Sequence, residues 1–175
     1  MRFLFYLLVL FMCQSCIGEG SEKIKESLKG VKECIALEEI VYQRTEGLLI
    51  LEKLSGSAFG KKPEELYYKI LLYYQQSQPQ LVGMCKDKEL NLSMAAYEKI
   101  NQSVEMLVKD TTSFDNELFE AFLHNLKRQR SLYFHVLEDS DLQHMHSYML
   151  ECYLQIVCFI EDIEHFRILA HQGYF

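Results

Sequence analysis

The residues in this chain best able to do chemistry are its six cysteines. Cys152 and Cys158 lie in a segment with helical periodicity, where a separation of six residues is about 9 Å along the axis and about 240° around it. A disulfide needs Cα atoms within about 7 Å of each other. In a continuous helix each of these thiols is therefore either free or bonded to a cysteine elsewhere, and the choice depends on the compartment.

The N-terminus predicts export. Arg2 precedes an unbroken apolar run, Phe3–Met12, and small and polar residues follow. The run is too short to cross a bilayer, which takes about 20 apolar residues, and it suits the central region of a secretory signal peptide. Cleavage after Ser15, Gly18 or Gly20 would fit, and Gly18 or Gly20 is preferred.

We therefore expect residues 1–20 to be a signal peptide and residues 21–175 to form one domain that is secreted, without further membrane insertion. The alternative is that the N-terminal segment is retained as a membrane anchor.

Export changes how the remaining cysteines are interpreted. Four of them lie outside the leader, and in an oxidising compartment four cysteines imply two bridges with three possible connectivities. Since the helix excludes a Cys152–Cys158 bond, Cys34 should pair with one of these two and Cys85 with the other. Each bridge would close a long loop and contribute roughly 3 to 5 kcal/mol.

The charge of the chain argues against nucleic acid as a partner. The net charge is −7 and no basic stripe is present. The short basic sequence KRQR at 127–130 is best interpreted as the solvated face of a helix.

Metal binding and catalysis have weak support. His144 and His146 are the best metal candidates, but two residues on a helix are about 200° apart and cannot share one ion. The Cys152–Cys158 spacing is not that of a zinc site. Pairing explains Cys85 better than a nucleophile beside a histidine does. We expect no metal, no cofactor and no enzymatic activity.

The distribution of apolar residues predicts an all-α fold. Only two prolines and eight glycines interrupt the chain, and no segment alternates with period two. A short helix after Pro63 should be followed by a loop over 77–91, within a long first crossover connection. The main helices are expected over 34–54, 93–109, 114–138 and from 142 onward, so the domain should be a cytokine-like bundle of four to five helices.

Three segments in succession resemble the type I interferon family. They are CIALEEIVYQRTEGLLILEKLSGSAF at 34–59, LSMAAYEKINQSVEMLVKDTTSFDNELFEAFLHNLKRQRSLYFHVLE at 92–138, and CYLQIVCFIEDIEHFRILAHQGYF at 152–175. The first is similar to that family's opening cysteine and arginine-bearing helix. The second matches its second and third helices, and the third its last helix.

Several positions depart from the family pattern. The family's Cys-Ala-Trp appears as Cys-Tyr-Leu at 152–154, and the chain has no tryptophan. A family cysteine expected near Glu65 is absent, whereas Cys85 and Cys158 are extra. Only residues 139–152 occupy the interval in which the family has a complete helix. Either that helix is truncated and merged with the last one, or the chain is a more distant class II helical cytokine.

The resemblance implies a monomeric extracellular ligand that brings two receptor chains together, so that their kinases act on each other and induce an antiviral response. The family's contacts with the tighter-binding receptor would fall on Leu66, Lys69, Phe159, Asp162, Ile163 and Phe166. Contacts with the other receptor would fall on Glu98, Glu105, Lys127 and Arg130. Each position could instead be ordinary core or solvated surface, Phe159 and Ile163 above all.

Two further expectations concern glycans and an alternative function. Asn91 and Asn101 each begin a glycosylation sequon, and Asn91 is favoured because it lies in a predicted loop. The alternative function is another secreted helical binding module, either an interleukin-10-like cytokine or a lipid carrier. A carrier predicts a sizeable apolar cavity.

Overall fold

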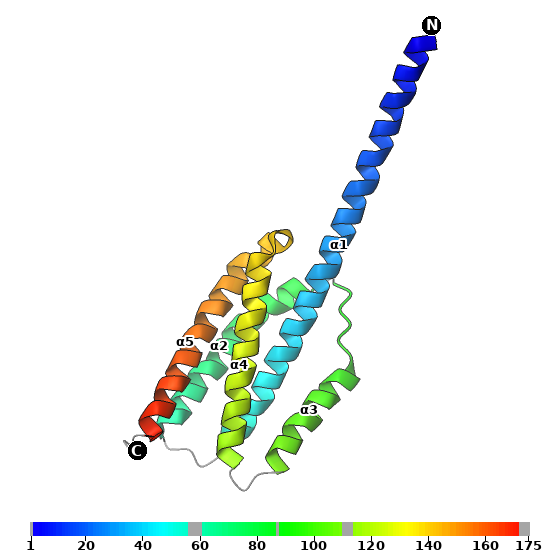
Figure 1. Cartoon of the computed structure of the whole chain (residues 1–175). Coiled ribbons are helices and arrows are strands. Elements are labelled where there is room, and N and C mark those ends of the chain that lie inside the picture. The colour runs from blue at the N-terminus through cyan, green and yellow to red at the C-terminus, as the bar shows by residue number, and fades with distance from the viewer. Residues whose placement is uncertain (1, 56–60, 87, 110–113, 172–175) are drawn as a thin grey trace.

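The computed structural model describes the backbone of residues 2–55, 61–86, 88–109 and 114–171, and the side chains of 24–54, 65–86, 88–106, 117–165, 167 and 168. These residues form five α-helices and one short 3-10 helix, with no strand among them (Figure 1). The all-α prediction is confirmed. The elements are α1 (Arg2–Ser55), α2 (Lys61–Cys85), α3 (Met94–Lys109), α4 (Phe114–Glu138), η1 (Ser140–Met145) and α5 (His146–His171).

Four helices form the bundle, in the spatial order α1, α2, α5, α4, and every neighbouring pair in this ring is antiparallel. The contacts within each pair show that the two helices run in opposite directions, because residues early in one helix contact residues late in the other. Examples are Lys127–Glu164 and Glu120–Arg167 between α4 and α5, at 2.6 and 2.8 Å.

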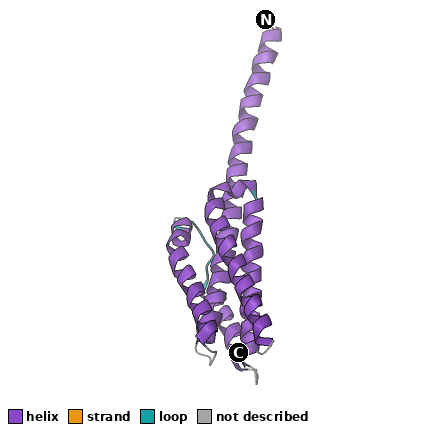
Figure 2. Cartoon of the chain, turned by 90° about the vertical axis from the view of Figure 1, so that its left-hand side faces the viewer, coloured by secondary structure: helices purple, strands orange, loops and turns teal. Residues whose placement is uncertain are grey.

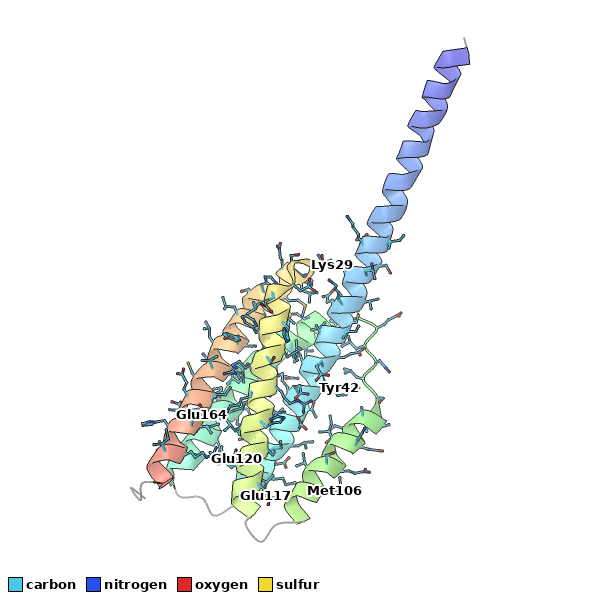
Figure 3. All side chains as sticks on the ribbon, in the orientation of Figure 1. Lys29, Tyr42, Met106, Glu117, Glu120 and Glu164 are labelled. Atoms are coloured by element: carbon cyan, nitrogen blue, oxygen red, sulfur yellow. The ribbon has the colours of Figure 1, made fainter. Side chains whose placement is uncertain are left out.

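α3 lies outside this ring, against α1 and α4 (Figures 1 and 2). It runs parallel to α1. The hydroxyl of Tyr42 donates to the Asn91 carbonyl oxygen at 2.9 Å near one end, and Lys53 pairs with Glu105 at 2.7 Å near the other (Figure 3). A crossover between two parallel helices is therefore present, as expected, but most of it is the 25-residue helix α2.

The predicted loop over 77–91 is wrong for its first half, because α2 continues to Cys85. Pro79 lies inside the helix on its exposed side. There the carbonyl that loses its hydrogen bond to the proline can bond to water instead. Leu81 is only 2 % exposed, and its burial holds the last turns against the bundle.

The remaining helix boundaries follow local signals. The Ser93 hydroxyl caps α3 by accepting from the Ala96 backbone N–H at 3.1 Å. The break predicted at 138–141 is present: the Asp139 carboxylate accepts from the Asp141 N–H, and Leu142 has a non-helical backbone (φ −105°, ψ 19°). The predicted N-cap Ser113 lies outside the described residues.

The apolar stripes expected from periodicity form the core. On η1 and α5 the predicted face is buried throughout: Leu142, Met145, Met149, Cys152, Ile156, Ile160 and Ile163. They pack against Leu37, Ile40 and Leu54 of α1, Ile70 and Tyr74 of α2, and Phe122, Leu126 and Tyr133 of α4. Tyr148 and Phe159 of α5 are buried as well, although they lie outside that stripe.

α1 is much longer than the helix expected over 34–54, and its N-terminal part projects beyond the bundle near Lys29 (Figures 1 and 3). Among the residues that the structure describes, no helix is both long enough and apolar enough to span a membrane. Export of the protein stays a prediction.

Candidate functional site

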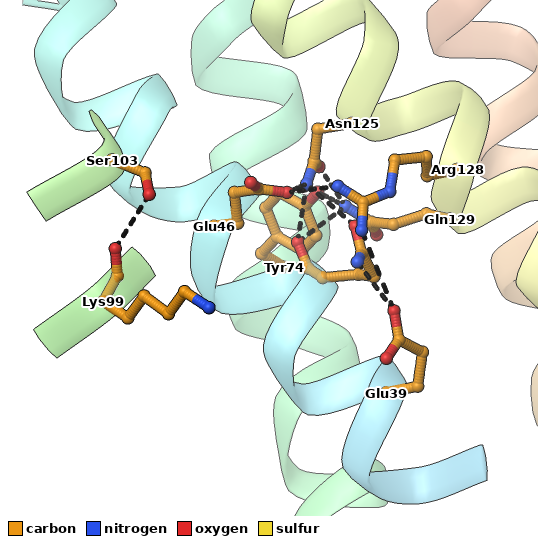
Figure 4. A network of polar contacts seen from close by, with 9 residues as sticks. Glu39, Glu46, Tyr74, Lys99, Ser103, Asn125, Arg128 and Gln129 are labelled. Atoms are coloured by element: carbon orange, nitrogen blue, oxygen red, sulfur yellow. Dashed lines mark hydrogen bonds and ion pairs between the residues drawn. The ribbon is translucent and has the colours of Figure 1, made fainter. Parts of the chain in front are cut away.

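A layer of polar side chains crosses the core between α1, α2 and α4 (Figure 4). The Asn125 amide donates to the Gln43 carbonyl oxygen at 3.0 Å and to Glu46 Oε2 at 2.7 Å. Gln129 Nε2 donates to Asn125 Oδ1 and to the Tyr74 hydroxyl oxygen, both at 2.7 Å. Such a layer is stable only because its members satisfy one another.

Arg44 lies beside this layer and is only 2 % exposed. Its Nη2 donates to the Tyr74 carbonyl oxygen at 3.0 Å and to Ser77 Oγ at 2.9 Å. The guanidinium carbon lies 5.6 Å from the ring centre of Tyr73 and 4.7 Å from that of Tyr74, within the range of cation–π attraction.

No carboxylate among the described side chains pairs with the charge of Arg44. Its Nε and Nη1 have no hydrogen-bond partner among the described residues. Arginine does not lose its proton in proteins, so the site carries a fixed positive charge. An uncompensated buried charge is costly, which makes Arg44 the most unusual residue in the core.

The groups around Arg44 are neutral at physiological pH. Burial raises the pKa of Tyr74 to about 12. Burial also raises the pKa of the Cys152 thiol above its ordinary value. A thiol that stays protonated is a poor nucleophile. The arrangement can therefore attract an anion and stack rings against a cation, but it offers no activated nucleophile.

A half-open cleft of about 310 Å³ lies between α2 and α5, next to this layer. Ser77, the hydrogen-bond partner of Arg44, forms part of its wall, so the guanidinium lies one side chain behind the surface. The cleft is lined by Lys69, Leu72, Tyr73, Gln76, Ser77, Gln80, Tyr148, Glu151, Cys152, Gln155 and Phe159. This mixed lining differs from the large apolar cavity that a lipid carrier would require.

Two of the positions proposed for the tighter receptor contact meet at this cleft. Lys69 is exposed on α2. Phe159 of α5 is buried, at 7 % exposed, with its ring 5.4 Å from that of Tyr73, so it reaches the cleft wall from the core. Asp162 is exposed nearby on α5. Ile163 is fully buried and therefore belongs to the core rather than to a contact surface.

Leu66 and Phe166 are the two remaining positions proposed for the tighter receptor contact. Leu66 is half-buried and packs against the core. The side chain of Phe166 lies outside the described residues.

The positions proposed for the second receptor do not form one patch. Glu105 of α3 pairs with Lys53 of α1, whereas Lys127 of α4 faces α5 and pairs with Glu164. Glu98 and Arg130 are exposed on α3 and α4. The interpretation of 127–130 as a solvated helix face holds for its basic residues, but Gln129 is completely buried.

The four cysteines outside the predicted leader are free thiols in the structure, and their pairing in an oxidising compartment stays a prediction. Cys152 is buried beside Tyr73 of α2. Tyr73 lies twelve residues before Cys85 on the same helix, so the two positions are about 18 Å apart along the helix axis. That distance is too great for the expected pairing of Cys85 with Cys152. Cys158 is exposed.

Cys34 and Cys85 lie instead at the same end of the bundle. Lys88 connects their neighbourhoods: its backbone N–H donates to the Cys85 carbonyl oxygen at 3.2 Å, and its ammonium group donates to Glu33 at 2.7 Å. A Cys152–Cys158 bond stays excluded, because both residues lie in the continuous helix α5. Local sequence patterns did not indicate that α2 would extend far enough to carry Cys85 to this end.

The sequons and histidines have ordinary surroundings. Asn91 is exposed and Asn101 is half-buried on α3. His144 contacts Glu33 at 2.9 Å, and His146 contacts the Asp139 carbonyl oxygen. Within the described part of the chain, no three metal-ligating side chains are grouped.

The polar layer was missed in the sequence, although a signal for it exists. Gln129 lies seven residues after Phe122 and four before Tyr133, so it shares their inward face. Polar residues on an otherwise apolar stripe indicate a buried network. The position of residues on a helix face does not reveal that Arg44 would be buried without a carboxylate partner among the described residues.

The fold and the site define a class: an all-α antiparallel bundle with a charged polar layer in its core and a cleft beside it. Comparison with protein-family models, curated proteins and solved structures finds no match for this chain.

Proposed function

We propose that this protein is a secreted signalling ligand of the class II helical cytokine kind, resembling a type I interferon. In this proposal the face formed by α2 and α5 binds one receptor ectodomain. A second receptor chain binds elsewhere on the bundle, and bringing the two together starts kinase signalling and an antiviral response.

One observation carries the proposal. Lys69 and Phe159, which the resemblance assigns to one receptor contact, come from distant parts of the chain and line the same cleft. Tyr68 and Leu72 beside them are 67 % and 39 % exposed. Exposed apolar side chains with a charged rim, here including Asp162, are the usual composition of a protein-binding surface.

The bundle also fits this proposal. Within the ring, α2 and α4 are both antiparallel to α1 and so parallel to each other. The long connection between them, which contains α3, is a crossover of the kind found in cytokine bundles. An interleukin-10-like cytokine would share that feature, and receptor specificity distinguishes the two.

The experiment uses the full chain expressed in animal cells and purified from the medium. Matched-species cells carrying an antiviral-gene reporter should respond in a dose-dependent way. Lys69→Glu should raise the concentration for half-maximal response about tenfold or more, because it reverses a charge within the proposed contact. Tyr68→Ala should act in the same direction.

Lys86→Glu is the matched control, since it makes the same charge change on an exposed residue away from the cleft. It should respond like the unmodified protein, and all variants should keep their helical circular dichroism. A reporter that stays silent at every dose, or equal effects of Lys69→Glu and Lys86→Glu, would contradict the proposal.

A further inference from the structure

Three hydrogen-bond donors in the core lack an acceptor of nitrogen or oxygen among the described residues. They are Nε and Nη1 of Arg44 and the hydroxyl of Tyr73. The Tyr73 hydroxyl has the Cys152 thiol beside it, but sulfur is only a weak acceptor. The site therefore has an excess of donors together with an excess of positive charge, and an anion would satisfy both.

The described carboxylates near the layer are engaged or exposed. Glu46 accepts from Asn125 and Arg128, and Glu39 lies 4.0 Å from Arg128 and accepts from Gln43. Glu151 is at the cleft but exposed. None of them forms an ion pair with Arg44.

The α2–α5 cleft brings solvent close to these donors. Tyr73 forms part of its wall, and so do Ser77, which contacts the guanidinium, and Tyr148, whose hydroxyl lies 3.4 Å from the Ser77 carbonyl oxygen. A ligand seated in the cleft would thus be separated from Arg44 by one layer of hydroxyl-bearing side chains. Direct contact with the guanidinium would require Tyr73 or Ser77 to be displaced.

We propose that the α2–α5 cleft binds a small organic monocarboxylate. Its apolar body packs between Leu72 and Phe159, and its carboxylate faces the Arg44 guanidinium and the Tyr73 hydroxyl.

The cleft and its charge select this class of ligand. A volume of about 310 Å³ is at the low end of the range for small-molecule sites, which favours a compact ligand. The apolar side chains suit a short hydrocarbon or aromatic body. Lys69 and Glu151 in the cleft wall offset each other in charge, so the buried guanidinium leaves an excess of one positive charge. A monoanion balances that excess better than a dianion such as phosphate.

The test compares carboxylates with their neutral amides on the full purified chain, without receptor or cells. Hexanoate and benzoate are titrated by calorimetry against hexanamide and benzamide, which have nearly the same shape. Each carboxylate should bind at least about tenfold more tightly than its amide, because the bond to a buried charged donor is lost in the amide. Inorganic phosphate should bind more weakly than either carboxylate.

Two variants locate the effect. Arg44→Met keeps the volume and removes the charge, so it should abolish the preference for carboxylate over amide. Arg128→Met, at a half-exposed arginine on α4, is the matched control and should leave the preference unchanged. If Arg44→Met does not fold, Tyr73→Phe removes one donor alone and should reduce carboxylate affinity several-fold.

The inference is overturned if acids and amides bind equally, if neither binds, or if Arg44→Met keeps the preference. Because the assay contains no receptor, its failure leaves the proposed signalling function untouched, and the converse also holds.

Discussion

Gly47 on α1 lies so close to Asn125 on α4 that a β-carbon at position 47 would be 2.6 Å from Asn125 Oδ1. The same carbon would be 2.9 Å from the Tyr74 hydroxyl oxygen and 3.1 Å from Gln129 Nε2. The absence of a side chain at Gly47 therefore makes room for the buried polar layer between α1 and α4.

Gly47→Ala should destabilise the fold by about 1 to 3 kcal/mol, although alanine is the better helix former by about 1 kcal/mol. The new methyl group would push Asn125 and Gln129 out of their mutual hydrogen bonds, and both are too buried to find water instead. Urea unfolding followed by circular dichroism measures the change.

Gly30→Ala is the matched control. Position 30 is also helical, but a β-carbon there meets nothing within 4 Å. This variant should be more stable than the unmodified protein by about 0.5 to 1 kcal/mol. If the two alanine variants changed stability in the same direction, close packing at Gly47 would not be the cause.

Arg44→Met should leave the ligand-free protein as stable as before, or stabilise it by about 1 to 3 kcal/mol. Removing the guanidinium leaves no carboxylate unpaired, since Arg44 has no carboxylate partner among the described residues. The methionine side chain also fills similar space. Arg128→Met should change stability by no more than about 0.5 kcal/mol, because that residue is half-exposed. A large loss of stability in Arg44→Met alone would mean that the guanidinium is a structural anchor.

Glu33 should make stability depend on pH in the acid range. Its side chain is only 9 % exposed and accepts from Lys88 at 2.7 Å and from His144 at 2.9 Å. Burial acts to raise the pKa of Glu33, but the bonds from Lys88 and His144 outweigh it and hold the pKa below its ordinary value.

Because the pKa of Glu33 is lower in the folded than in the unfolded chain, its stabilisation is fully present above the unfolded-state pKa of about 4.3. It is lost as the pH falls through the folded-state value. Glu33→Gln should therefore cost about 1 to 2 kcal/mol at pH 7, and this cost should shrink as the pH falls through the folded-state pKa and vanish well below it. Glu26→Gln, on an exposed part of α1, should cost little across this pH range. A pH-independent difference for Glu33→Gln would argue against the ion pairs.

The cysteines should differ in accessibility and pairing. In reduced, folded protein an alkylating reagent should modify Cys158 readily and Cys152 very slowly, because Cys152 is 1 % exposed and burial raises its thiol pKa. In oxidised material, non-reducing peptide mapping should find any intramolecular bridge between Cys34 and Cys85. A bridge between Cys85 and Cys152 would require α2 to be displaced from its position in the bundle.

Much of the fold follows from local patterns. Ser93, Asp139 and the apolar repeat from Leu142 to Ile163 correctly predict where helices begin, where they break and which face is buried. Pro79 and Gly83 were misleading, because the burial of Leu81 outweighs their local preference against helix.

The amino-acid sequence by itself determined the helical class, the inward faces and the position of most breaks, because helix periodicity and capping act over a few residues. Only the tertiary structure decided that Arg44 lies buried without a carboxylate, that Gly47 admits Asn125, and that Lys69 meets Phe159. Those relationships depend on how far each helix extends and which helices become neighbours, and packing of the whole chain sets both.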